Sequence, residues 1–187
     1  MMRGLDLAVF YAINRWPDTL TPLFYFISEC TKWLPVRIFL LSLFLAMIGW
    51  QKTRKAAICA VIAFPLTNEL CDLLKDGFQV LRPCVELADV TLRVNKLTSF
   101  GTASAHSGNM SAIALVMTYY LGWKWGLPWM IIALLSGLSR IYVGVHYPSQ
   151  VLLGWTCGVI VALLTVKVAD WIQNTIKARR EARAVVP

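Results

Sequence analysis

The sequence predicts an all-α fold, a polytopic transmembrane helical bundle with five or six spans. Of its 187 residues, 58% are apolar, and the mean hydropathy is +0.61. Globular domains are about 45–50% apolar, and a chain of this length has too small an interior to bury the excess. No internal repeat, low-complexity tract or linker interrupts the sequence. Residues 1–187 are therefore expected to form a single membrane-embedded domain.

Five apolar segments are long enough to cross a bilayer, which takes about 20 largely apolar residues. These segments are residues 34–50, 55–74, 105–121, 127–143 and 151–171. Tryptophans stand at several of their ends, where an aromatic belt at the membrane surface is expected. Together the five segments predict a core of spans over residues 34–171.

The N-terminal part of the chain is apolar as well, but arginine, proline and aspartate interrupt it at residues 15–18. Proline removes a backbone hydrogen-bond donor, and charged side chains resist the hydrocarbon core. Residues 1–33 are therefore expected to form either a kinked sixth span or two helices that lie at the membrane interface.

Basic residues indicate how the spans are oriented. If the spans alternate, one side of the membrane receives Arg3, Lys52, Arg54, Lys55, Lys124, Lys177, Arg179, Arg180 and Arg183. The positive-inside rule makes that side cytoplasmic, so the basic tail over residues 172–187 is predicted to be cytoplasmic. The net charge of +8 then reflects topology and attraction to anionic lipids. No basic domain stands free of the membrane to bind nucleic acid.

Three polar clusters between the spans carry the chemistry of this chain. They are Lys75 with Arg82 and Pro83, then Ala103, Ser104, Ala105 and His106, and finally Ser139 and Arg140 with His146 and Gln150. The predicted topology places all three clusters at the outer face. Together they supply three cations, a small hydroxyl group and both histidines of the chain. These are the groups needed to hold a phosphate and to transfer it.

Each cluster suits a phosphate for a physical reason. Arginines such as Arg82 donate two parallel hydrogen bonds from a planar fork. Ser104 is a good N-cap at the start of a predicted span, where free backbone N–H groups form an anion site. Arg140 lies inside an apolar span, where a charge is costly and marks a candidate site. A purely structural Arg140 would instead pair with a carbonyl group, Glu69 or Asp72.

The pattern resembles the signature of the type 2 phosphatidic acid phosphatase family of integral membrane lipid phosphatases. That signature is Lys-x6-Arg-Pro, then Pro-Ser-Gly-His, then Ser-Arg-x5-His-x3-Asp, and the resemblance covers residues 34–171. It implies that His146 attacks phosphorus and forms a phosphohistidine, and that His106 protonates the leaving oxygen and then activates water. The implied phosphate ligands are Lys75, Arg82, Ser104, the Ala105 backbone N–H and Arg140. The family is metal-independent, so neither a metal nor another cofactor is expected.

Gln150 is the main departure from the family pattern, because it stands where the family has aspartate. Ala103 and Ala105 replace proline and glycine, which are milder changes. A glutamine oxygen can still orient the His146 imidazole, but it brings no negative charge. Three interpretations follow: a slow but real enzyme, compensation by another carboxylate, or a site that binds phosphate without efficient turnover.

Two carboxylates in the span before Lys75 are candidates for such compensation. Asp72 lies three residues before Lys75, on nearly the same helix face, and Glu69 lies about one turn deeper. A purely structural Asp72 would instead form an ion pair with Lys75. Ser139 is a further auxiliary candidate through the resemblance.

The resemblance implies a membrane lipid phosphatase, and the predicted topology puts its site at the outer face, expected to be that of a bacterial inner membrane. Its substrate would be a lipid phosphate or diphosphate, such as undecaprenyl diphosphate, phosphatidate, phosphatidylglycerophosphate or a lipid A phosphate. One alternative is a phosphate-lipid binding or transport protein on the same scaffold, and a second is a transporter that uses Glu69, Asp72 and Arg140. The expected partners are the substrate and membrane lipids, without nucleic acid, and the oligomeric state stays open.

Overall fold

A computed structural model describes residues 2–184 as helices joined by loops, with no strand in that range. The α-helices are α1 (Met2–Asn14), α2 (Thr21–Glu29), α3 (Leu34–Gly49), α4 (Arg54–Phe78), α5 (Pro83–Glu86), α6 (Ala105–Leu121), α7 (Trp123–Tyr142) and α8 (Pro148–Ala184). Two short 3-10 helices, η1 (Asp18–Leu20) and η2 (Cys30–Lys32), flank α2. The predicted all-α fold class is confirmed. Met1 and residues 185–187, the end of the predicted tail, lie outside the described residues.

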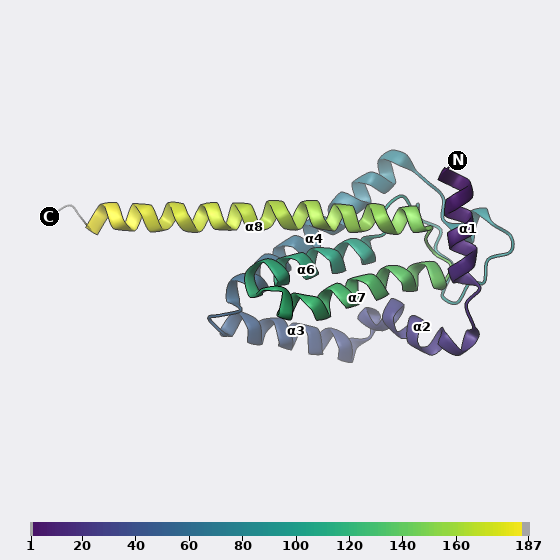
Figure 1. Cartoon of the computed structure of the whole chain (residues 1–187), viewed down its shortest axis with the longest axis horizontal. Helices are drawn as coiled ribbons and strands as arrows, with labels where there is room; N and C mark the ends of the chain where they lie inside the picture. The colour runs from purple at the N-terminus through teal and green to yellow at the C-terminus, as the bar shows by residue number, and fades with distance from the viewer. Residues whose placement is uncertain (1, 185–187) are drawn as a thin grey trace.

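Helix α6 lies at the centre of the bundle and contacts α4, α7 and α8 (Figure 1). Small buried side chains line the meeting of α4, α6 and α8, namely Ala56, Ala60, Ala63, Ala112 and Ala162. Small residues let membrane helices approach closely. At the crossing of α6 and α8, a Cβ atom on Gly158 would lie 2.1 Å from the Gly108 carbonyl oxygen, so only glycine fits there.

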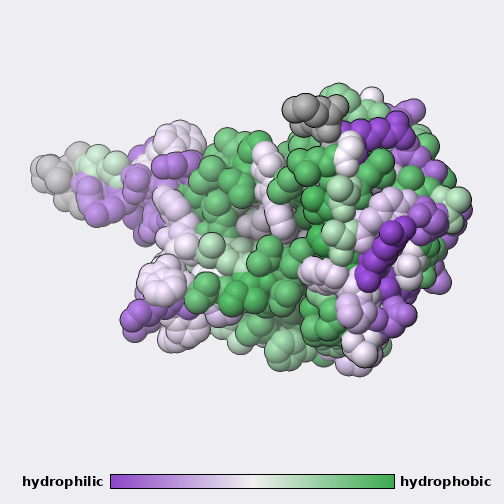
Figure 2. All heavy atoms as spheres, turned by 45° about the vertical axis from the view of Figure 1, so that its right-hand side comes forward, coloured by the Kyte–Doolittle hydropathy of each residue, from purple (hydrophilic) through white to green (hydrophobic). Residues whose placement is uncertain are grey.

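The bundle has two distinct ends (Figure 1). Helices α4 and α7 run toward the end that α1 crosses, whereas α3, α6 and α8 run away from it. All three polar clusters therefore lie at the α1 end, and the basic residues near the α3–α4 turn and along the C-terminal part of α8 lie at the opposite end. The expected place of Arg3 among those basic residues is wrong, because α1 lies across the cluster end and Arg3 pairs there with Glu86. Figure 2 shows apolar side chains over the middle of the visible face and hydrophilic ones toward both ends.

The number of spans expected from the sequence is not confirmed by helix length and composition alone. Within the described residues, two segments are long and apolar enough to cross a membrane, Arg54–Glu86 and Pro148–Arg183. A third is added if Asp18–Lys32 and Leu34–Gly49, which meet at a 69° bend, form one span. Helix α6 has only 17 residues, which is the lower end of the range of about 17–25 residues for a span.

The N-terminal helices are fixed to the end of the bundle that holds the clusters. Helix α2 packs against α7, and the rings of Phe24 and Tyr142 lie 4.8 Å apart between centroids. The Tyr142 hydroxyl accepts a hydrogen bond from Thr21 at 2.8 Å and donates to the Pro17 carbonyl at 3.1 Å. At the end of α1, the Asn14 amide donates to the Tyr142 carbonyl at 2.9 Å.

Candidate active site

His146 and Arg82 meet although they are far apart in the sequence. His146 lies in the short loop between α7 and α8, and Arg82 lies in the loop between α4 and α5. Nη1 of Arg82 is 2.7 Å from Nε2 of His146. Because arginine can only donate, Nε2 of His146 accepts this hydrogen bond and carries no proton. The lone pair that a nucleophilic histidine uses is thus present at Nε2.

Gln150 fixes the other side of the His146 ring. The Nδ1–H group of His146 donates to Oε1 of Gln150 at 3.0 Å, and the Tyr147 backbone N–H donates to the same oxygen at 3.2 Å. The Gln150 amide nitrogen donates to the Leu81 carbonyl at 2.9 Å. These contacts leave one orientation of the Gln150 amide that satisfies all partners, so the imidazole is held with Nε2 toward Arg82.

Gly101 makes room for this amide. A Cβ atom on Gly101 would lie 2.7 Å from Oε1 of Gln150 and 2.8 Å from Cγ of Arg82. Both side chains are almost fully buried, so neither can move aside at low cost. The close approach of the Gly101 backbone is therefore part of how the site holds the Gln150 and Arg82 side chains.

The environment of His146 favours the neutral imidazole. Burial lowers the pKa of His146 well below its usual range, and the charges of Arg82 and Arg140 lower it further. The hydrogen bond to Gln150 acts in the opposite direction but is a smaller effect. Burial in low dielectric and nearby like charge both disfavour the imidazolium.

Arg82 is rigidly positioned by three further contacts. Its Nε donates to the Ser99 carbonyl at 2.7 Å, Nη2 donates to the Ser99 hydroxyl at 3.2 Å, and Nη1 also donates to the Val145 carbonyl at 3.2 Å. Only 4% of Arg82 is exposed. A fixed guanidinium beside the Nε2 lone pair is suited to holding phosphoryl oxygens next to the nucleophile.

Ser104 and His106 begin α6, as the sequence predicts for Ser104 as an N-cap. The Ser104 hydroxyl accepts from the Ser107 hydroxyl at 2.9 Å, and its backbone N–H donates to the Gln150 carbonyl at 2.9 Å. The second contact joins the start of α6 to the start of α8. Ala105 is the first residue of α6, where backbone N–H groups have no intrahelical partner.

Four cations act electrostatically on the His106 imidazole. They are Arg140, Lys32, Lys75 and Arg82. Three of them belong to the clusters found in the sequence. The fourth, Lys32, comes from the end of η2 and is not part of any predicted cluster.

Arg140 is anchored by α2. Its Nη1 donates to the Ser28 hydroxyl and carbonyl and forms an ion pair with Oε1 of Glu29 at 3.4 Å. Of the partners named for a purely structural Arg140, the carbonyl group is present, at Ser28. Glu69 and Asp72 are not its partners, because α2 rather than α4 packs beside this part of α7. Nε of Arg140 is buried and has no hydrogen-bond partner among the described residues. One edge of the guanidinium is thus held, and an N–H on the other is left for a ligand.

Lys75 pairs with Asp72 at 2.6 Å, which is the plain role expected for that carboxylate. Asp72 also accepts from the Asn68 amide at 2.8 Å, whereas Glu69 is exposed. The Nδ1–H group of His146 donates to Gln150 and not to Asp72 or Glu69. The Ser139 hydroxyl is buried and donates to the Ser136 carbonyl at 2.7 Å within α7.

Comparison with known proteins places the chain in a family. The sequence model of the PAP2 superfamily matches residues 36–173. The chain belongs to the PAP2 superfamily. An undecaprenyl-diphosphatase of Sulfolobus acidocaldarius is 32% identical over 171 residues, covering 88% of this chain and 79% of the relative. A lipid A 4'-phosphatase of Bacteroides thetaiotaomicron is 28% identical, covering 72% of this chain and 64% of the relative.

Two solved structures share the fold. LpxE of Aquifex aeolicus superposes with a TM-score of 0.76 at 26% identity, covering 87% of this chain and 95% of its own. A transmembrane PAP2-type phosphatidylglycerolphosphate phosphatase of Bacillus subtilis has a TM-score of 0.73 at 23% identity, covering 91% and 87%. The second likeness shows the fold alone.

Sequence reasoning missed three residues that the structure adds to this PAP2 site: Ser28, Glu29 and Lys32. All three precede the residues 36–173 that match the superfamily. A glutamate within an apolar N-terminal stretch was the available signal, since a charge there needs a partner. Its partner, Arg140, lies 111 residues away, and the sequence gives no register between α2 and α7.

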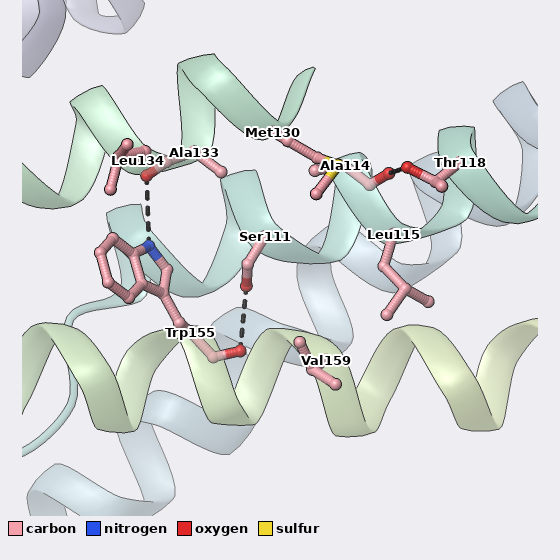
Figure 3. Close-up of a pocket in the computed structure, with 9 residues that line it drawn as sticks. All are labelled: Ser111, Ala114, Leu115, Thr118, Met130, Ala133, Leu134, Trp155 and Val159. Carbon is pink, nitrogen blue, oxygen red and sulfur yellow. Dashed lines mark hydrogen bonds between the residues drawn. The ribbon is translucent and has the colours of Figure 1, made fainter. Parts of the chain in front are cut away.

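A separate apolar pocket lies between α6, α7 and α8 (Figure 3). It is lined by Ser111, Ala114, Leu115, Thr118, Met130, Ala133, Leu134, Trp155 and Val159. The Trp155 indole donates to the Ala133 carbonyl at 3.2 Å, and Ser111 donates to the Trp155 carbonyl at 3.1 Å. None of the lining residues is a cation or a histidine, so this pocket is suited to hydrocarbon rather than to a phosphate.

Proposed function

We propose that this PAP2 protein is an integral membrane lipid phosphatase that releases phosphate from a lipid phosphate or diphosphate through a phosphohistidine on His146. The superfamily match and the phosphatase relatives support the activity. One observation carries the mechanism: the buried, neutral His146 presents its Nε2 lone pair to the Arg82 guanidinium. Undecaprenyl diphosphate is the first candidate substrate, and phosphatidate, phosphatidylglycerophosphate and a lipid A phosphate follow.

In the first step, Nε2 of His146 attacks the terminal phosphorus as the bond to the leaving oxygen breaks. His106 gives a proton to that oxygen, and the lipid product departs. In the second step, His106 takes a proton from water, the water oxygen attacks the phosphohistidine, and inorganic phosphate leaves. Arg82, Arg140 and Lys75 stabilise the charge on the phosphoryl oxygens during both steps, together with Ser104 and the Ala105 N–H.

Gln150 takes the place of the family aspartate in this proposal. Its oxygen orients His146, so geometry is retained, but a neutral amide gives less support to a positively charged imidazole. The serine-protease triad is an analogy, where replacing aspartate by the neutral amide lowers turnover about 10⁴-fold. We therefore propose a real but slow enzyme. Asp72 pairs with Lys75, which leaves compensation from that carboxylate without support.

We also propose the placement of the chain in the membrane. In this proposal α3, α4, α6, α7 and α8 form five spans, and the 69° bend between α2 and α3 supports an interfacial α2 rather than a sixth span. The basic end of the bundle supports a cytoplasmic tail over residues 172–187 and a site on the outer, periplasmic side of a bacterial inner membrane. Residues 34–171 then form the phosphatase core, with residues 1–33 laid at its outer end.

The test is phosphate release by detergent-purified protein, with EDTA present and the four candidate lipids offered separately. Release by the wild type that disappears in His146→Ala would support a metal-independent histidine phosphatase. Gln150→Asp is the companion variant, and faster release from it would support the proposed cost of the neutral amide. No release from the wild type together with clear release from Gln150→Asp would instead favour a phosphate-lipid binding protein.

A further inference from the structure

A carboxylate bridges two cations at the bend between α2 and α3. Oε1 of Glu29 pairs with Arg140 at 3.4 Å, and Oε2 pairs with Nζ of Lys32 at 2.5 Å. Lys32 closes η2, and Nε of Arg37 holds this turn through the Thr31 carbonyl at 2.8 Å. The Lys32 ammonium is therefore kept next to the phosphate ligand Arg140 by a structured turn.

Of these three side chains, Lys32 is exposed, whereas Glu29 and Arg140 are nearly buried. Glu29 and Arg140 have side chains that are 10% and 3% exposed, whereas the Lys32 side chain is 53% exposed. Lys32 is thus the exposed end of this chain of charges, and Arg140 is its buried end. Lys32 also acts electrostatically on His106.

The order from buried Arg140 through Glu29 to exposed Lys32 defines which part of a substrate Lys32 would meet. In phosphoryl transfer the attacking and leaving oxygens lie roughly in line on opposite sides of phosphorus. With the transferred phosphate at Arg140, a second phosphate attached to it would lie nearest the exposed Lys32. His146 is the proposed attacking group, so this second position is that of the leaving group. When a monoester is cleaved, that group is an uncharged alcohol. When a diphosphate is cleaved, it is a lipid phosphate with negative charge.

We propose that Lys32 binds the lipid-attached phosphate of a diphosphate substrate, and that Glu29 holds the ammonium in place before the substrate arrives. This inference rests on the proposed phosphatase function and deepens it, because it names lipid diphosphates as the preferred class. The cation stabilises the charge that builds on the bridging oxygen as the bond to the terminal phosphorus breaks. A monoester gains nothing comparable from Lys32.

The test compares one polyprenyl chain as its diphosphate and as its monophosphate. Lys32→Gln should lower kcat/KM for the diphosphate about tenfold, as the loss of one charge-assisted hydrogen bond predicts, and leave the monophosphate value within about twofold. Lys32→Arg should restore most of the diphosphate rate, because it keeps the charge. Lys96→Gln is the matched control, since Lys96 is an exposed lysine at the same end of the bundle.

The outcomes separate the subsite from the phosphatase activity. Equal losses on both substrates in Lys32→Gln, or no loss on either, would overturn the subsite while the wild type remains a phosphatase. An equal diphosphate-specific loss in Lys96→Gln would overturn it too, because general surface charge would then suffice. If the wild type hydrolyses neither lipid, the proposed function fails and the subsite fails with it.

Discussion

The His146 imidazole is held at both ring nitrogens, and each contact has a different consequence. Gln150 accepts a hydrogen bond from Nδ1–H, which selects the tautomer, and Arg82 donates to Nε2, the atom proposed to attack phosphorus. A substrate must replace the Arg82–His146 contact with contacts from its own oxygens. The guanidinium then moves from protecting the nucleophile to stabilising the transferred group.

The pH dependence of the first step should reflect the lowered pKa of His146. Because burial and the neighbouring arginines lower that pKa, the imidazole takes up a proton only at a pH below about 6.5, the ordinary value for histidine. We expect phosphohistidine formation to keep its rate as the pH falls through that value. Rapid-quench trapping of the phosphoenzyme measures this directly. An acid limb at or above that pH would show that His146 is not shielded in this way.

Gly101→Ala should reduce phosphate release by about 10- to 100-fold, the scale expected when a catalytic group is displaced by about 1 Å. The new Cβ atom would press on both Gln150 and Arg82. Gly77→Ala is the control, since a Cβ atom there meets nothing within 4 Å. The measurement is the initial rate of phosphate release by the two variants at equal concentrations of folded protein. Similar rates for Gly101→Ala and Gly77→Ala would mean that the Gln150 side chain shifts to make room without loss of activity.

Residues close in the sequence were the predictable part of this site. His146 and Gln150 lie four residues apart, and Ser104 lies at a recognisable helix start. The contact of Arg140 with Ser28 and Glu29 spans more than a hundred residues. It depends on how α2 docks on α7, which no local pattern specifies.

At the scale of helices, the docking of α2 on α7 is a structural requirement for the site. The pairing of Glu29 with Arg140 is buried, and removing one partner of a buried pair typically costs about 3–5 kcal/mol because the other charge stays unpaired. Glu29→Gln is therefore expected to lower the thermal midpoint of the detergent-solubilised protein and to reduce activity.

Glu181→Gln is the matched control for this change. It makes the same substitution in the pair Lys177–Glu181, whose side chains are 75% and 67% exposed. Exposed pairs contribute about 0–1 kcal/mol, so its thermal midpoint should hardly move. Equal midpoints for Glu29→Gln and the wild type would indicate that α2 does not depend on this pair for its docking.

Hydropathy predicted where the long apolar helices lie better than it predicted where they end. The segment 105–121 coincides with α6, and 34–50 nearly coincides with α3. Helix α8 instead continues to Ala184, far past the expected end at residue 171. Hydropathy detects the apolar part of a helix, whereas the polar extension stays helical through its backbone hydrogen bonds and an i,i+4 pair.

For the whole molecule, charge and chemistry divide between the two ends of the bundle. The end that α1 crosses holds both histidines and the cations proposed to bind phosphate, and the other end holds most of the remaining basic residues. Successive spans are expected to run in opposite directions, and each cluster lies between spans at a position that returns to the same face. The sequence therefore predicted that the clusters would lie at one end. Their contacts needed the three-dimensional packing of α2, α4, α6 and α8.

Which end faces the cytoplasm is a prediction that labelling can test. Lys96→Cys places a thiol at the histidine end, and Lys52→Cys places one at the basic end, both at exposed positions. Because lysine and arginine are retained on the cytoplasmic side during insertion, a membrane-impermeant maleimide should label Lys96→Cys in intact cells and Lys52→Cys only after permeabilisation. The wild type, with its five native cysteines, gives the background. The reverse pattern would place the phosphatase site in the cytoplasm, where a lipid phosphate on the outer leaflet could not reach His146.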